Sequence, residues 1–139
     1  MRSRVSIFIL TCGLLIFACQ QKQEPTHEPS IMYEASELAR LMRNMHDTLL
    51  VWKNDVQAGD SVYIHPQYFE GIHTAQATNP DEINDAFYLL ASSFEQSIYT
   101  FNKTQDITSY NLVVNSCVTC HKSYCQGPIP KIEKLYIEP

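Results

Sequence analysis

Glycine, basic residues and long apolar segments are all scarce in this sequence of 139 residues. Four Gly are too few for the many tight turns of a β-sandwich or β-barrel. Lys and Arg total 10 against 15 Asp and Glu, and they are dispersed, which argues against a nucleic-acid binder because neutralising phosphates takes clustered positive charge. The length allows one domain, and the composition favours a helical one.

The N-terminus has the pattern of a bacterial lipoprotein signal. Two arginines precede an apolar run of fourteen residues at 5–18, which is too short to cross a bilayer, since that takes about 20 apolar residues. The run is followed by Cys19, and a small residue followed by Cys resembles the point at which a lipoprotein is cleaved and lipidated. We expect residues 1–18 to be removed and Cys19 to carry the lipid. Ordinary cleavage nearby, with Cys19 unmodified, is the alternative.

Residues 19–29 form a separate segment between this anchor and the domain. They are polar, contain Pro25 and Pro29 and show no periodicity, so we predict a flexible tether. Residues 30–139 are then a single domain outside the cytoplasm. We expect it on the periplasmic side of a bacterial membrane, with the outer membrane favoured, and held there through the lipid.

Apolar residues recur at helical spacing in four segments of the domain. We expect helices at 30–58, with Ser30 as its N-cap, and at 66–78, 81–101 and 106–124. Short connections make an all-α, antiparallel four-helix bundle the simplest assembly. Pro128 and Pro130 cannot continue a helix, so we expect the tail from 126 to pack back in extended form. The first helix buries a seam formed by Ile31, Ala35, Leu38, Met42, Met45, Leu49, Trp52 and Val56.

The fourth segment contains Cys117-Val118-Thr119-Cys120-His121, which is the C-x-x-C-H attachment motif of c-type haem. Cys117 and His121 are four residues apart and therefore share a helix face, with Cys120 beside them. Two thioether bonds can fix the porphyrin edge while the imidazole binds the iron. Export supports this interpretation, because bacteria attach this haem after export. We predict one covalently bound haem c.

Two other functions are possible for these residues besides haem attachment. Cys117, Cys120, His121 and Cys125 could hold a structural zinc ion, and Cys117 and Cys120 could form a redox-active disulfide. Four ligands within nine residues of one helix do not easily surround a metal tetrahedrally, and this favours haem.

The chain resembles a known family, the class II cytochromes c, which comprise the cytochromes c′ and their low-spin relatives. Residues 117–124 match that family's C-x-x-C-H-x-x-Y pattern, and Leu41-Met42-Arg43 is similar to its Met-bearing segment. The resemblance covers most of residues 31–125. It implies a four-helix bundle with haem attached near the C-terminus, in which two copies often pair through their first helices.

The resemblance also implies roles for single residues. Cys117 and Cys120 would carry the thioethers, His121 would be the proximal iron ligand and Met42 the distal one. The family's cytochromes c′ commonly have Arg after the Tyr, whereas this chain has Cys125, so that Arg's role does not carry over. We interpret Cys125 as a small buried residue that ends the helix.

The distal ligand stays open between several residues. Met42 lies on the predicted inward seam, Met45 follows it on the same seam, and His46 lies at i+4 from Met42 near the edge of the seam. Seam methionines also serve simply as core residues, which would leave the iron five-coordinate.

These features predict an electron carrier and not an enzyme. The protein would pass single electrons between its haem and redox partner proteins without changing substrate bonds. A five-coordinate haem protein of the cytochrome c′ type that binds NO or CO is one alternative function. A zinc-stapled structural lipoprotein is another.

Overall fold

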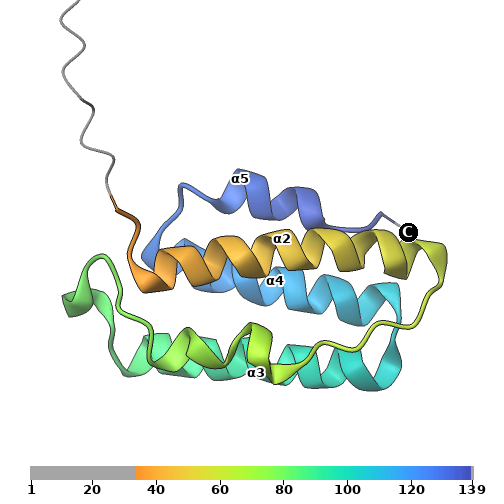
Figure 1. Cartoon of the computed structure of the whole chain (residues 1–139), viewed down its shortest axis with the longest axis horizontal. Helices are drawn as coiled ribbons and strands as arrows, with labels where there is room; N and C mark the ends of the chain where they lie inside the picture. The colour runs from red at the N-terminus through yellow and green to blue at the C-terminus, as the bar shows by residue number, and fades with distance from the viewer. Residues whose placement is uncertain (1–33, 139) are drawn as a thin grey trace, which may run out of the picture. The chain divides into compact units, whose positions relative to one another are not determined.

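Helices form all the regular structure in the described part of the chain. The computed structural model describes residues 34–138, and no strand occurs among them. The long helices are α2 (Glu37–Ala58), α3 (Asp85–Thr104) and α4 (Ile107–Tyr124), which are labelled in Figure 1. The all-α class is therefore confirmed for this range. The predicted signal peptide, the lipidation site Cys19, the tether and the Ser30 cap lie outside the described residues.

Helix α2 begins later than the apolar spacing predicts. Ser36 caps it by accepting a hydrogen bond from the Ala39 N–H (3.2 Å), so Ala35 precedes the helix and is not part of it. The predicted end at Ala58 is confirmed, because Gly59 adopts a left-handed conformation with φ of 81° that closes the helix. On the predicted seam, the side chains of Met45, Leu49 and Val56 are buried, and those of Leu38, Met42 and Trp52 pack partly buried against the core.

The prediction of a second α-helix is wrong. Residues 66–78 contain two short 3₁₀ segments, η1 (Pro66–Tyr68) and η2 (Glu70–His73). Phe69 lies between them with φ of −140°, outside the helical region, and its ring packs edge-on against Phe94 at a centroid distance of 5.9 Å. Packing of this ring therefore overrides the local helical spacing. The predicted burial of Phe69 and Ile72 is confirmed, whereas Ala75 is only half-buried.

Helix α3 also begins later than predicted, because residues 80–82 form the separate 3₁₀ segment η3 (Pro80–Glu82). Asn84 caps α3 by accepting from the Phe87 N–H (3.2 Å). The predicted bounds of the fourth helix are confirmed, since Asp106 caps α4 and the helix ends at Tyr124.

The C-terminal tail is helical where we expected an extended segment. It forms α5 (Ile129–Ile132) followed by the 3₁₀ segment η4 (Glu133–Leu135). Pro128 is the N-cap of α5 and Pro130 lies in its first turn, where a missing N–H leaves no hydrogen bond unmade, so both are compatible with the start of this helix. The expected packing is confirmed, because Ile137 is buried and exchanges hydrogen bonds with the Asn111 side chain (2.8 and 2.9 Å).

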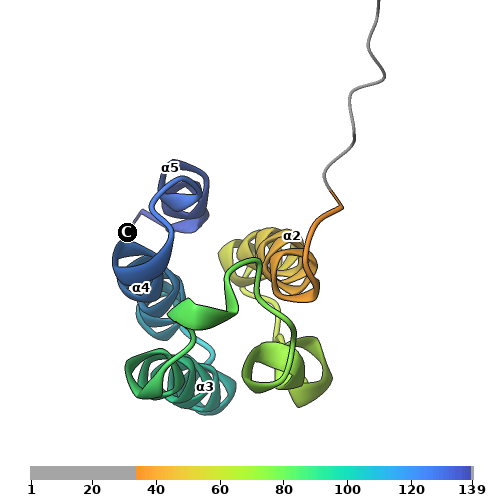
Figure 2. The same cartoon turned by 90° about the vertical axis from the view of Figure 1, so that its left-hand side faces the viewer.

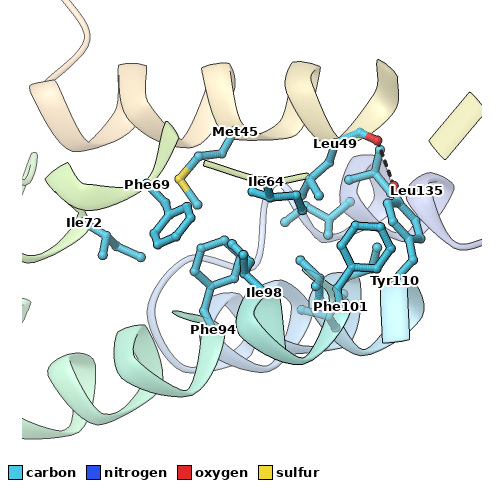
Figure 3. Packing of buried hydrophobic residues seen from close by; sticks show 14 of the residues in the cluster. Met45, Leu49, Ile64, Phe69, Ile72, Phe94, Ile98, Phe101, Tyr110 and Leu135 are labelled. Atoms are coloured by element: carbon cyan, nitrogen blue, oxygen red, sulfur yellow. Dashed lines mark hydrogen bonds between the residues drawn. The ribbon is translucent and has the colours of Figure 1, made fainter. Parts of the chain in front are cut away.

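The core lies between α2, α3 and α4, and the tail and residues 62–72 complete it. Seen end-on, η1 and η2 lie beside α2 and α3, and α5 lies over α4 (Figure 2). Tyr110 of α4 is fully buried, and its hydroxyl donates a hydrogen bond to the Leu49 carbonyl of α2 (2.8 Å), drawn in Figure 3. This bond satisfies the one polar atom of a large buried side chain and ties α2 to α4.

Candidate haem-attachment site

Helix α4 carries the three residues of the C-x-x-C-H motif in its last two turns. The helix is continuous from Ile107 to Tyr124, so the predicted one-face arrangement is present. Cys117 and Cys120 are half-buried, and His121 is buried with 8% of its surface exposed. The motif therefore points into the protein and not into solvent.

A cavity of about 480 Å³ lies beside the motif and is called the main cavity below. Cys120 and His121 line it from α4, Met42 and His46 from α2, and residues 77–83 and α5 form its other walls. Most of its lining is apolar. Its volume lies in the range of cofactor sites, which are mostly apolar with few polar groups.

A smaller cavity of about 40 Å³ adjoins the main one. Met42, His46, Cys120 and His121 line both, and Cys117 lines only the smaller cavity. The structure thus brings all three motif residues together with Met42, as the sequence analysis predicts.

The orientation of the His121 ring is fixed by Cys125. His121 Nδ1 lies 3.1 Å from the Cys125 carbonyl oxygen and 3.2 Å from Cys125 Sγ. A carbonyl only accepts, so Nδ1 carries the proton and donates it. Nε2 is then left without a hydrogen, which is the arrangement found in metal-binding histidines.

Burial lowers the pKa of His121, and the hydrogen bond to the Cys125 carbonyl opposes that shift only in part. The neutral imidazole is therefore favoured. The neutral form is the one that binds a metal, so the ring is ready to act as a ligand without first losing a proton.

The two motif thiols are not activated for redox exchange. Burial, reinforced by the neighbouring Cys120, raises the pKa of Cys117 to about 12, and burial also raises the pKa of Cys120. Thiol exchange requires the thiolate, which these shifts disfavour at neutral pH. Both cysteines carry free thiols. This environment argues against the disulfide alternative.

Two of the three candidate distal ligands face the site from α2. Met42 is half-buried and lines both cavities with His121. His46 also lines both, and its Nδ1 lies 3.0 Å from the Asp47 carboxylate. Met45 is 7% exposed, lines only the smaller cavity and lies in the core beside Phe69 (Figure 3). The geometry therefore favours Met42 and His46 over Met45.

No cluster of zinc ligands is present in the described part of the chain. Within residues 34–138, no group of three or more His, Cys, Asp and Glu side chains is arranged to hold a metal ion. In the same range, no helix is long and apolar enough to cross a membrane.

Cys125 differs from its predicted role, since it is exposed and not buried. Helix α4 ends at Tyr124, and Cys125 has an extended conformation with φ of −157°; its side chain is exposed, although Sγ still lies beside the His121 ring. Its contacts with His121 could not be predicted from the sequence, because they depend on the backbone conformation that Cys125 adopts after the helix end.

Tyr124 is a further site residue whose contacts the motif alone did not define. Its hydroxyl donates to Asn84 Oδ1 (2.8 Å), and its ring packs edge-on against Phe87 at a centroid distance of 5.5 Å. It thus joins the end of α4 to the cap of α3 at the wall of the main cavity. Its only sequence signal is the final position of C-x-x-C-H-x-x-Y.

The donor set around the two cavities fits a c-type haem. It comprises two thiols for thioether bonds, a neutral imidazole with a free Nε2, and a methionine on the facing helix. No family model, curated protein or solved structure matches this chain.

Proposed function

We propose that this protein is a lipid-anchored monohaem cytochrome c that transfers single electrons outside the cytoplasm. The observation that carries the proposal is the contact between His121 Nδ1 and the Cys125 carbonyl (3.1 Å) beside a largely apolar cavity. This contact prepares Nε2 as an iron ligand in the residue that the C-x-x-C-H motif assigns to the iron.

Each residue of the site then has a defined task. Cys117 and Cys120 hold the haem through thioethers, His121 binds the iron on the proximal side, and Met42 binds it from α2. The bound haem supplies a reversible one-electron change of its iron. The apolar walls exclude water and, with the methionine ligand, favour the reduced state.

We infer that the domain around this site is an antiparallel four-helix bundle in which η1 and η2 take the place of the second helix. Gln105 and Asp106 alone connect α3 to α4, and those two helices pack extensively against each other. Residues of η2 contact both α2 and α3 (Figure 2). This order of neighbours is the one that an up-down-up-down bundle requires.

The anchor and the partners complete the proposal. Lipid on Cys19 would keep the domain at the periplasmic side of a membrane, with the outer membrane favoured, and residues 19–29 would let it move relative to that surface. Redox proteins would then be its partners, and two copies would pair through their first helices. No substrate is transformed, so the protein is a carrier and not an enzyme.

The visible spectrum of the purified protein tests the proposal. The full chain is produced in a bacterium that attaches c-type haem after export, and is purified in mild detergent. We expect a low-spin haem spectrum in both oxidation states, with the charge-transfer band of a methionine–iron bond in the oxidised protein. A high-spin spectrum that shifts on adding CO or NO would favour a gas-binding haem protein, and the absence of a haem band would reject both haem functions.

A further inference from the structure

Cys125 makes three hydrogen-bond contacts with His121. Its N–H donates to the His121 carbonyl (2.9 Å), its carbonyl accepts from His121 Nδ1 (3.1 Å), and its Sγ lies 3.2 Å from that same Nδ1. The imidazole Nδ1 carries a single hydrogen, so the oxygen and the sulfur share it. Two of these contacts use backbone atoms of Cys125 and do not involve its side chain, whereas the third depends on the side chain.

The end of α4 produces this arrangement. The helix stops at Tyr124, and Cys125 turns to φ of −157° and ψ of 94°, which folds both its carbonyl and its side chain back toward the preceding turn. The thiol stays partly accessible to solvent and also lines the main cavity. A thiol sulfur is only a weak hydrogen-bond acceptor, so this third contact is the weakest of the three.

We propose that Cys125 is a positioning residue for the proximal haem ligand, whose side chain sets how strongly the Nδ1 proton of His121 is held. The proposal rests on the proposed function, because it concerns the imidazole that would bind the iron. A stronger acceptor at position 125 makes the imidazole more electron-rich, which stabilises the oxidised iron. A weaker acceptor has the opposite effect. Position 125 therefore tunes the reduction potential.

A series of variants at this position tests the proposal. We compare Cys125→Ala, which removes the side-chain acceptor, with wild type and with Cys125→Asp, which introduces a carboxylate. The midpoint potential is expected to fall in the order Ala, Cys, Asp. Between the Ala and Asp proteins we expect at least about a tenfold change in the reduction equilibrium, or about 59 mV for a one-electron couple. The Nδ1 hydrogen resonance of the reduced, diamagnetic protein should move downfield in the same order.

Ser123→Asp is the matched control for the added charge. Ser123 is exposed, lies two residues before Cys125 and lines neither cavity, so its carboxylate has no contact with the ring. This variant should shift the potential far less than Cys125→Asp and should leave the Nδ1 resonance in place. Equal shifts from the two Asp variants, or an Ala protein with wild-type potential and resonance, would overturn the proposal.

Alkylation gives a second measurement that does not require a variant to fold. Once two thiols are in thioethers and Cys19 carries lipid, Cys125 is the free thiol of the exported chain, and iodoacetamide can reach it in the holoprotein. Displacing the sulfur from the ring should raise the potential toward that of the Ala protein, and an unchanged potential would count against the proposal. The mass of each sample shows whether haem is attached, and so distinguishes failure of this inference from failure of the proposed function. Covalent haem with no tuning rejects only this inference, and a wild type without haem rejects the proposed function as well.

Discussion

Met42 of α2 and His121 of α4 line the same main cavity, and they also share the smaller cavity that adjoins it. Two side chains that face one space from neighbouring helices can bind one iron from opposite sides. His46 lines the same space one turn after Met42. Whether one of these two residues binds the iron decides between an electron carrier and a five-coordinate, gas-binding haem protein.

Substitution of Met42 tests the distal ligand. Met42→Ala should convert the spectrum from low spin to high spin and lower the midpoint potential, because the reduced iron loses the thioether that favours it. Absorption spectroscopy and redox titration measure both effects.

Met45→Ala is the matched control, since Met45 is buried in the core and lines only the smaller cavity. It should remain low-spin. Its free energy of unfolding should fall by about 2–5 kcal/mol, the usual cost of truncating a buried Met. A low-spin Met42→Ala protein combined with a high-spin His46→Ala protein would transfer the ligand role to His46.

Acid should destabilise the haem-free protein through His121. The folded pKa of this group lies below its ordinary value of 6.5, so its stabilising effect is complete above pH 6.5 and is lost as the pH falls toward the folded pKa. Urea unfolding of a haem-free Cys117→Ala/Cys120→Ala protein at pH 7.5 and pH 5 measures the loss. His121→Gln in that background should lose less stability over the same interval, and an identical loss would show that other groups are responsible.

The bond between the Tyr110 hydroxyl and the Leu49 carbonyl should contribute to stability. Tyr110→Phe removes the hydroxyl from a buried site and should cost about 1 kcal/mol of unfolding free energy, measured by urea titration. Tyr99→Phe is the control, because the Tyr99 side chain is 55% exposed, and its cost should be close to zero. Equal costs for the two variants would mean that the bond adds nothing.

Membrane association should depend on Cys19. Cys19→Ser should prevent lipidation and either release the folded domain or leave the precursor unprocessed. Cys12→Ser, which changes the cysteine inside the apolar run at 5–18, should leave association intact. Fractionation of cells and the mass of the N-terminal peptide measure the outcome. A fully processed Cys19→Ser protein that still sediments with membranes would place the anchor elsewhere.

Local sequence signals are enough to predict where helix α4 begins and ends. Asp106 caps α4, and the chain after Tyr124 lacks a helical pattern, so both ends of the motif-bearing helix follow from the sequence. Long-range packing decides the parts that the sequence misses. Burial of the Phe69 ring breaks the second helix into 3₁₀ segments, and burial of Ile132 and Leu135 makes the tail helical.

Some residues of the candidate site could likewise be predicted from the sequence, and others could not. Spacing alone identifies Cys117, Cys120 and His121 as one group, and the seam of the first helix brings in Met42. The cavity walls from residues 77–83 and α5 depend on how distant segments fold together, whereas the contact of Cys125 with His121 depends on the backbone conformation of Cys125 just after the helix. A residue pattern carries no such information.

Covalent haem is the central claim, and the mass of the denatured protein tests it most directly. Wild type and Cys125→Ala should each carry the mass of one haem after denaturation and extraction, and should stain for haem on a denaturing gel. The Cys117→Ala/Cys120→Ala protein should carry none, and each single variant should keep a weaker, single thioether attachment. A wild-type protein whose mass equals that of its polypeptide and lipid alone would contradict the account.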